Sequence, residues 1–304
     1  MTLLELIETS AQQLTDAGVA FGHGTSNAFD EAAWLVLWQL GLPLDTPLDA
    51  PSDGPSDDQQ FMPNRPVDSV EQEQVAALLR ARIKSRKPAA YLTHEAWLMG
   101  VPFYVDERAI VPRSLIAELL VNGGIDYWLS DATRTVLDLC SGNGSLAVLA
   151  ALAYPEITVD ASDISAAALE VARINVNKHH LARRIELIES DGLPAVNGRY
   201  DLILCNPPYV NAQSLATLPL EFQAEPVLAL DGNRRGGSDG MDFIRGLLRV
   251  APVHMSEQAV LVLEIGNERS NFEAAFPKLE AIWLQTSAGE DQVLLLTREA
   301  LTKC

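Results

Sequence analysis

The chain has 304 residues, and its 41 acidic and 22 basic residues give a formal net charge of −19 at pH 7. Hydrophobic residues make up 48% of it, which predicts a globular protein with a sizeable core in one large or two smaller domains. The charge argues against nucleic acid as the main partner and against an anionic membrane surface, because both are bound by lysine and arginine patches. The charge permits a cationic partner, because the electrostatic field of the protein would steer the encounter with it. The alternative is that the charge serves only solubility.

The sequence does not indicate a disulfide framework, a metal site, a leader or a membrane span. Its three cysteines, Cys140, Cys205 and Cys304, show no paired spacing, and no Cys/His cluster has zinc spacing. The N-terminal segment carries two glutamates but no lysine or arginine, unlike a signal peptide. The longest apolar run, Leu146 to Tyr154, falls short of the about 20 residues that a spanning helix needs. We therefore expect a soluble cytoplasmic protein without metal.

Residues 1–90 are predicted to form a small helical domain. Apolar residues recur at helical spacing over 3–14, over 32–40 and over 75–83. Between the last two of these segments, residues 41–66 are rich in Pro, Asp, Ser and Gly and indicate a loop.

The acidic residues are concentrated near the N-terminus. Residues 1–64 contain ten acidic residues and no basic one, because the first base is Arg65. We therefore expect this domain to supply much of the steering toward a basic partner, with Asp53, Asp57 and Asp58 contributing.

Residues 91–112 are predicted to form a hairpin or extended linker, after which strands and helices alternate. Strands are expected over 135–139, 157–162, 185–189, 200–205, 259–265, 281–286 and 292–297. Helices are expected over 114–122, 144–153, 165–178, 240–250 and 268–276. This alternation predicts an α/β fold with a mainly parallel sheet covered by helices on both faces. The last two strands are joined too closely for a crossover, so they must be antiparallel neighbours.

A glycine-rich turn follows the first of these strands. Residues 140–145 read Cys-Ser-Gly-Asn-Gly-Ser, and a strand, glycine turn and helix in succession present backbone N–H groups to a ligand at the carboxyl end of a sheet. The next strand ends at Asp163, 19 residues after Gly144, where a carboxylate can hold ribose hydroxyls. The pattern fits NAD and the adenosine of S-adenosylmethionine equally. A plain tight turn, with Asp163 as a helix N-cap, is the alternative.

The fourth strand runs into Asn206-Pro207-Pro208-Tyr209. The prolines end the strand pairing and hold Asn206 extended. The side-chain oxygen of Asn206 and the carbonyl of Pro207 can accept the two hydrogens of a planar –NH2 group, against which Tyr209 can pack. Because amides and aromatic amines are poor nucleophiles, such positioning can supply much of the catalysis of a methyl transfer. The alternative is a rigid loop after a strand.

These motifs, in this order, resemble those of the class I S-adenosylmethionine-dependent methyltransferases. The resemblance is closer to the protein-(glutamine-N(5)) methyltransferases of the HemK type, and it runs from about residue 20 to 297. It implies a helical N-terminal substrate-recognition domain (1–90), a hairpin linker (91–112) and a seven-stranded Rossmann-like methyltransferase domain (113–304). It also implies S-adenosylmethionine as the methyl donor and no metal.

The resemblance further implies roles for individual residues. Asn206, Pro207 and Tyr209 are expected to be catalytic, and the substrate is expected to contact Asn206, Pro207, Pro208, Tyr209 and Arg113. Cofactor binding is expected from Asp138, Ser141, Gly142, Asn143, Gly144, Ser145, Asp163, Asp191 and Asn206. Arg113 could position either the linker or the substrate. Gly192 stands where relatives have a bulky residue, so the adenine contact must come from elsewhere, with Leu193 as the candidate.

Two segments, 21–31 and Val111–Leu119, look like the family branch that modifies the third protein of the large ribosomal subunit, as does Cys140. We therefore expect methylation of a glutamine amide in that basic protein. The alternatives are a glutamine of a release factor, an adenine amino group of nucleic acid, an NAD-dependent oxidoreductase, or a module that binds without catalysis.

Overall fold

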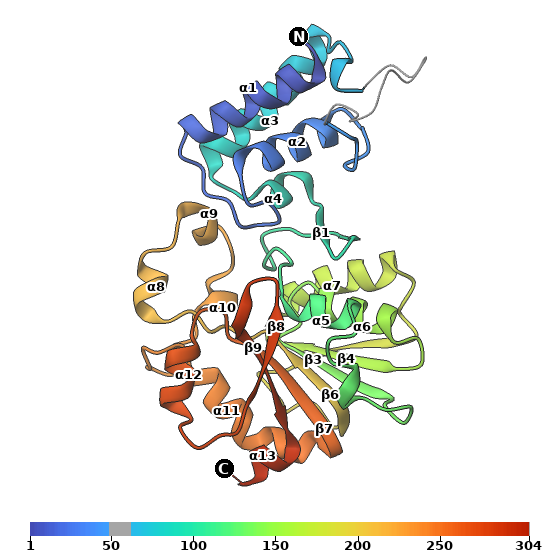
Figure 1. Ribbon diagram of the computed structural model, residues 1–304, viewed down its shortest axis with the longest axis vertical. Helices are drawn as coiled ribbons and strands as arrows, with labels where there is room; N and C mark the ends of the chain where they lie inside the picture. The colour runs from blue at the N-terminus through green and yellow to red at the C-terminus, as the bar shows by residue number, and fades with distance from the viewer. Residues whose placement is uncertain (49–61, 304) are drawn as a thin grey trace. The chain divides into compact units, whose positions relative to one another are not determined.

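The computed structural model describes residues 1–48 and 62–303, and the chain divides into two compact units (Figure 1). The helical unit comprises Met1–His94 together with Pro219–Ala224. The α/β unit comprises Glu95–Leu218 and Glu225–Cys304. Six residues within the range expected for the methyltransferase domain are thus part of the helical unit.

The helical unit is built from α1 (Leu3–Asp16), α2 (Ala28–Gln39), α3 (Ser69–Ser85), α4 (Ala89–Thr93) and α9 (Leu220–Gln223), with a short 3-10 turn at Met62–Asn64. Helix α1 begins at a capping box, in which Thr2 and Glu5 satisfy each other's backbone N–H groups. Its buried face, including Leu3 and Ile7, joins Leu35 of α2 and Leu79 of α3 in one core. Half of the predicted loop over 41–66, residues 49–61, lies outside the described residues.

A two-stranded hairpin opens the α/β unit. Strands β1 (Ala96–Leu98) and β2 (Val101–Phe103) are antiparallel, and Ala96 pairs with Phe103. Phe103 is fully buried in the larger core of this unit, so the hairpin is packed onto the domain that follows it.

The sheet of the α/β unit contains β3 (Thr135–Leu139), β4 (Thr158–Asp163), β5 (Ile185–Glu189), β6 (Tyr200–Cys205), β7 (Met255–Glu264), β8 (Ile282–Thr286) and β9 (Gly289–Thr297). The strand order is β5-β4-β3-β6-β7-β9-β8. Strands β3 to β7 are parallel, whereas β9 is antiparallel to both of its neighbours. The predicted α/β fold, with a mainly parallel seven-stranded sheet ending in an antiparallel strand, is confirmed.

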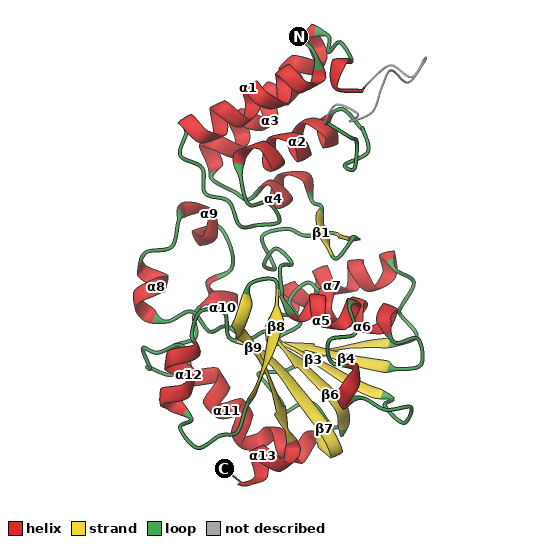
Figure 2. Cartoon of the chain, in the orientation of Figure 1, coloured by secondary structure: helices red, strands yellow, loops and turns green. Residues whose placement is uncertain are grey.

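Helices cover both faces of this sheet (Figure 2). One face packs against α5 (Ile116–Val121), α6 (Ser145–Ala153) and the end of α7 (Ala166–Lys178). The other packs against α11 (Asp242–Val250), α12 (Arg269–Ala275) and α13 (Arg298–Lys303). Because β3 has β4 on one side and β6 on the other, the connections diverge at its carboxyl end, where a ligand crevice is expected.

Residues 210–231 form an excursion that the sequence did not indicate. The backbone N–H of Val210 donates to the Leu230 carbonyl at 2.9 Å, which closes the base of the excursion directly after the Asn-Pro-Pro-Tyr motif. Within it lie the short helices α8 (Ala212–Ala216), α9 and α10 (Val227–Leu230). None of the helices in the described residues is long and apolar enough to cross a membrane.

Candidate active site

A cleft of about 680 Å³ opens at the carboxyl ends of β3, β4 and β6. Of the residues expected to take part in catalysis or binding, five line it: Gly142, Asp163, Asp191, Asn206 and Pro208. These residues come from four different connections after strands, so the fold brings together side chains that are far apart in the chain.

Gly142 lies in the turn between β3 and α6, with φ +55°, a left-handed conformation that favours glycine. A Cβ placed on Gly142 would meet no atom within 4 Å, so its backbone faces open space. At Gly144 (φ +78°), by contrast, a Cβ would lie 3.0 Å from the Cβ of Ala172 in α7. The first glycine therefore leaves room in the cleft, and the second allows α6 and α7 to pack closely.

Asp138 is fully buried beneath this turn and does not line the cleft. Its Oδ2 accepts hydrogen bonds from Ser141 Oγ at 2.8 Å and from the Ala147 backbone N–H at 3.0 Å. Burial raises the pKa of this carboxyl to about 7, and the two hydrogen bonds only partly oppose that rise. Asp138 and Ser141 thus hold the shape of the turn from behind.

Asn143, Gly144 and Ser145 also lie behind the cleft wall. The Oδ1 atom of Asn143 accepts the Ser145 backbone N–H at 3.0 Å, at the start of α6. The Nδ2 atom of Asn143 donates to the Ile110 carbonyl at 3.3 Å, and Ile110 does line the cleft. These contacts place the turn against the segment that follows the hairpin.

Asp163 ends β4 and faces the cleft. Its Oδ2 accepts the backbone N–H of Gly142 at 2.8 Å, and its Oδ1 accepts that of Ser165 at 2.8 Å. Burial raises the pKa of this carboxyl, although the backbone hydrogen bonds oppose the shift. The N-cap of α7 is Ser165 and not Asp163, so the N-cap alternative for Asp163 is wrong. Its carboxylate joins the glycine turn to the next connection.

The Asn-Pro-Pro-Tyr motif directly follows β6. Asn206 is half-buried at the cleft, and no hydrogen bond joins its side chain to another residue within the described ranges. Pro207 is buried. Tyr209 packs against Gly266, where a Cβ would lie 2.7 Å from the Tyr209 Cε2 atom. Burial raises the pKa of the Tyr209 hydroxyl, which keeps it neutral. The motif is thus rigid, with an unused amide group at the cleft.

Arg113 does not line the cleft but is held by a carboxylate. Its Nη1 and Nη2 atoms donate to Oε1 and Oε2 of Glu225 at 2.6 and 2.7 Å, in a bidentate pair. Of the two roles open to Arg113 from the sequence, this contact favours positioning of the linker.

Phe243 and Arg234 are among the cleft residues that the sequence did not indicate. Leu193 is buried in the core and does not line the cleft, so it does not supply the apolar wall expected of it. Phe243 of α11 lines the cleft instead, and its Cε2 lies 3.8 Å from the position that a Cβ on Gly192 would occupy. Arg234 lines the cleft as well. The glycine at 192 was the available signal, because it leaves space for another side chain.

Metal ligands do not cluster at the cleft in the part of the chain that the structure describes. Among the described residues, no group of three or more His, Cys, Asp or Glu side chains could hold a metal ion. The polar groups facing the cleft suit an organic ligand with hydroxyl and amino groups.

Comparison with known proteins gives consistent matches. Residues 118–233 match the family described as "Methyltransferase small domain". The chain is 50% identical to the ribosomal protein uL3 glutamine methyltransferase of Bordetella pertussis, over 99% of this chain and 96% of that protein. It is 47% identical to the protein of the same name from Burkholderia pseudomallei, over 97% and 94%.

Among solved structures, the hMettl16 catalytic domain in complex with a 3′UTR hairpin has a TM-score of 0.50 and 11% identity. The match covers 75% of this chain and 81% of that one. This likeness concerns the fold alone.

Proposed function

Because this chain belongs to the family of ribosomal protein uL3 glutamine methyltransferases, we propose that it methylates the side-chain amide nitrogen of a glutamine in uL3, using S-adenosylmethionine. The observation that carries the proposal is the Asn206 side chain, which lies at the cleft without a hydrogen-bond partner among the described residues. Near-full-length identity of 50% and 47% to two proteins of that name supports the choice of substrate.

The residues around the cleft fit S-adenosylmethionine. Asp163 would accept hydrogen bonds from the ribose hydroxyls, and the open backbone at Gly142 would admit the methionine end. Phe243 would cover the adenine, with Asp191 at the same end of the cleft. When bound, S-adenosylmethionine supplies an electrophilic methyl group. Asp138, Ser141, Asn143, Gly144 and Ser145 would contribute by holding the turn in shape.

The chain's own contribution to methyl transfer would be to hold the amide. The Asn206 Oδ1 and the Pro207 carbonyl would accept its two N–H hydrogens, and the neutral Tyr209 ring would pack against its plane with Pro208 alongside. Accepting both hydrogens orients the nitrogen lone pair and stabilises the positive charge that develops on nitrogen. No side chain needs to act as a base before transfer.

The negative charge supports a basic protein as the substrate. A ribosomal protein as the substrate supports the cytoplasm as the place of reaction. Five acidic residues of the first 48 are exposed in the helical unit: Glu5, Glu8, Asp16, Asp30 and Asp45. Glu31 is not one of them, because it is buried in an ion pair with Arg82. Of the acids expected to steer, Asp53, Asp57 and Asp58 lie outside the described residues.

Mass spectrometry of purified uL3, incubated with S-adenosylmethionine and this protein, tests the proposal. We expect one glutamine of uL3 to gain about 14 mass units, because replacing one N–H hydrogen by a methyl group is the net addition of one CH2 group. The Asn206→Ala variant should lose about 10²- to 10³-fold in rate while still binding S-adenosylhomocysteine. Methylation of a release factor, or of nucleic acid, with uL3 unmodified would overturn the proposed substrate.

A further inference from the structure

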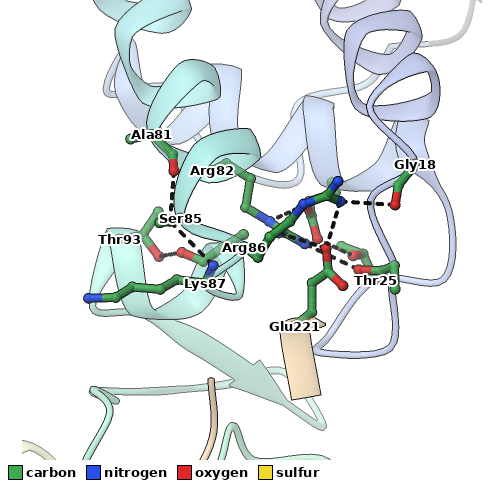
Figure 3. A network of polar contacts seen from close by, with 12 residues as sticks. Gly18, Thr25, Ala81, Arg82, Ser85, Arg86, Lys87, Thr93 and Glu221 are labelled. Atoms are coloured by element: carbon green, nitrogen blue, oxygen red, sulfur yellow. Dashed lines mark hydrogen bonds and ion pairs between the residues drawn. The ribbon is translucent and has the colours of Figure 1, made fainter. Parts of the chain in front are cut away.

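Helix α9 lies in the middle of the 210–231 excursion, yet it belongs to the helical unit. Its Glu221 is only 2% exposed. Figure 3 shows the side chains of Arg82, from the last turn of α3, and of Arg86, which directly follows this helix, pointing toward this glutamate. Arg86 Nη1 donates to Glu221 Oε1 at 3.1 Å, and Arg82 Nη1 lies 3.7 Å from the same oxygen. A charged side chain of the 210–231 excursion is therefore buried within the helical unit, against two arginines that lie far from it in the sequence.

The charges in this cluster are balanced. Arg82 is fully buried, and its Nε donates to Glu31 Oε1 of α2 at 2.8 Å. Two guanidinium groups are thus matched by two carboxylates, Glu31 and Glu221. Buried ion pairs of this kind are costly to break, because the remaining partner is left as an uncompensated charge. Burial opposes ionisation of Glu221, but hydrogen bonds from backbone N–H groups and Arg86 lower its pKa below the usual range.

A second contact fixes the same segment. The ring of Phe222 packs against that of His23, with centroids 4.2 Å apart. A Cβ on Gly22, which has φ +125°, would lie 3.1 Å from the Phe222 Cζ atom. Two consecutive residues of α9 thus contact the rest of the helical unit: Glu221 pairs with the arginines at the end of α3, and Phe222 packs closely against the loop before α2.

The residues directly after α9 reach the active site. Glu225 holds Arg113 and also accepts the Val111 backbone N–H at 3.0 Å. Pro226, Leu228 and Ala229 then line the cleft. Glu225 follows Glu221 by only four positions. Anchoring the side chain of Glu221 therefore restricts the conformations open to the backbone at Glu225 and at the cleft-lining residues that follow it.

From this arrangement we infer that Glu221 is a positioning residue of the active site: its burial between Arg82 and Arg86 fixes the excursion that supplies one wall of the cofactor cleft. The inference rests on the proposed cofactor cleft and adds to it a distant residue that touches neither substrate nor cofactor.

Binding of S-adenosylhomocysteine and amide hydrogen exchange of the full-length chain test the inference. In Glu221→Gln, we expect the Kd to rise roughly fivefold and exchange over 225–230 to become roughly tenfold faster. Exchange in the central strands β3 and β6 should not change. Glu73→Gln is the matched control, because its ion pair with Arg80 is exposed in the same unit, and it should behave as wild type.

Arg86→Gln gives a second test if Glu221→Gln unfolds the helical unit, since it leaves the buried Arg82–Glu31 pair intact. It should shift the Kd and the exchange in the same direction, and the double variant should add little to either single change. A lower melting temperature with unchanged Kd and unchanged exchange over 225–230 would overturn the inference alone. Failure of the wild-type chain to bind S-adenosylhomocysteine would overturn both the inference and the proposed cleft.

Discussion

Glu225 and Arg113 form a bidentate ion pair, at 2.6 and 2.7 Å, between residues that are 112 positions apart in the chain. The glutamate side chain is fully buried, and its Oε1 also accepts the Val111 backbone N–H. One carboxylate thus joins the segment after the hairpin to the segment that leads into the cleft wall.

Glu225→Gln should therefore destabilise the protein. The amide would turn an N–H donor toward the guanidinium and leave its charge unmatched, which costs roughly 3 kcal/mol of unfolding free energy. Arg113→Lys should cost less, because it keeps the charge but loses the two-pronged geometry. Denaturant titration measures both effects. Glu299→Gln, which breaks an exposed pair with Lys303, serves as the control and should leave the stability unchanged. Equal stability of Glu225→Gln and wild type would show that the pair does not hold these segments.

The sheet and the motif-bearing turns were predictable because their signals are local. The short segment Thr135–Leu139, in which three of the five residues are Val or Leu, is followed at once by a glycine turn, which is typical of a buried parallel strand leading to a helix N-terminus. The Asn-Pro-Pro-Tyr motif carries its own rigidity, since two prolines fix the backbone whatever surrounds them. Both features depend on a few consecutive residues.

The remaining contacts depend on residues distant in sequence. Glu221 meets Arg86, which lies 135 positions earlier, and nothing in the residues around either one specifies the other. The same holds for Phe243, which reaches the cleft because α11 packs beside Gly192. The local sequence predicted Leu193 for that wall, but its side chain is buried in the core instead. Pairings of this kind follow from the packing of whole elements, which a local pattern does not contain.

Phe243 is expected to contribute directly to cofactor affinity. Phe243→Ala should raise the Kd for S-adenosylhomocysteine roughly tenfold, because an aromatic wall contributes about 1 kcal/mol beyond the area it buries. Isothermal titration calorimetry gives the constant. Tyr127→Ala, which removes an aromatic ring that is 88% exposed, is the control and should bind as wild type does. Unchanged binding by Phe243→Ala would mean that another side chain covers the adenine.

Asp138 should give the protein a pH-dependent stability. Its pKa of about 7 in the folded chain exceeds the usual 3.8, so between these values the folded state holds a proton that the unfolded state has lost. The stabilising contribution is fully present below pH 3.8 and is lost as the pH rises toward 7, at about 1.4 kcal/mol per pH unit. In Asp138→Asn this slope should be absent, which denaturant titrations across that window would detect. The exposed Asp131→Asn should keep the wild-type slope, and an identical slope in Asp138→Asn would contradict the prediction.

The acidic face of α1 should speed association with a basic substrate. Glu8 and Asp16 are both exposed and eight positions apart in α1, which is about 80° of rotation at 3.6 residues per turn, so both lie on one broad face of the helix. The variant Glu8→Gln/Asp16→Asn should lower kcat/KM for uL3 by roughly two- to threefold at low salt and leave kcat unchanged, because steering acts on encounter alone. At an ionic strength of about 0.15 M the difference should shrink, since screening then acts over about 8 Å. The variant Asp131→Asn/Glu156→Gln makes the same change in net charge in the α/β unit and should have less effect. If kcat/KM of the wild-type protein is the same at all salt concentrations, the charge of −19 contributes to solubility and not to capture of the substrate.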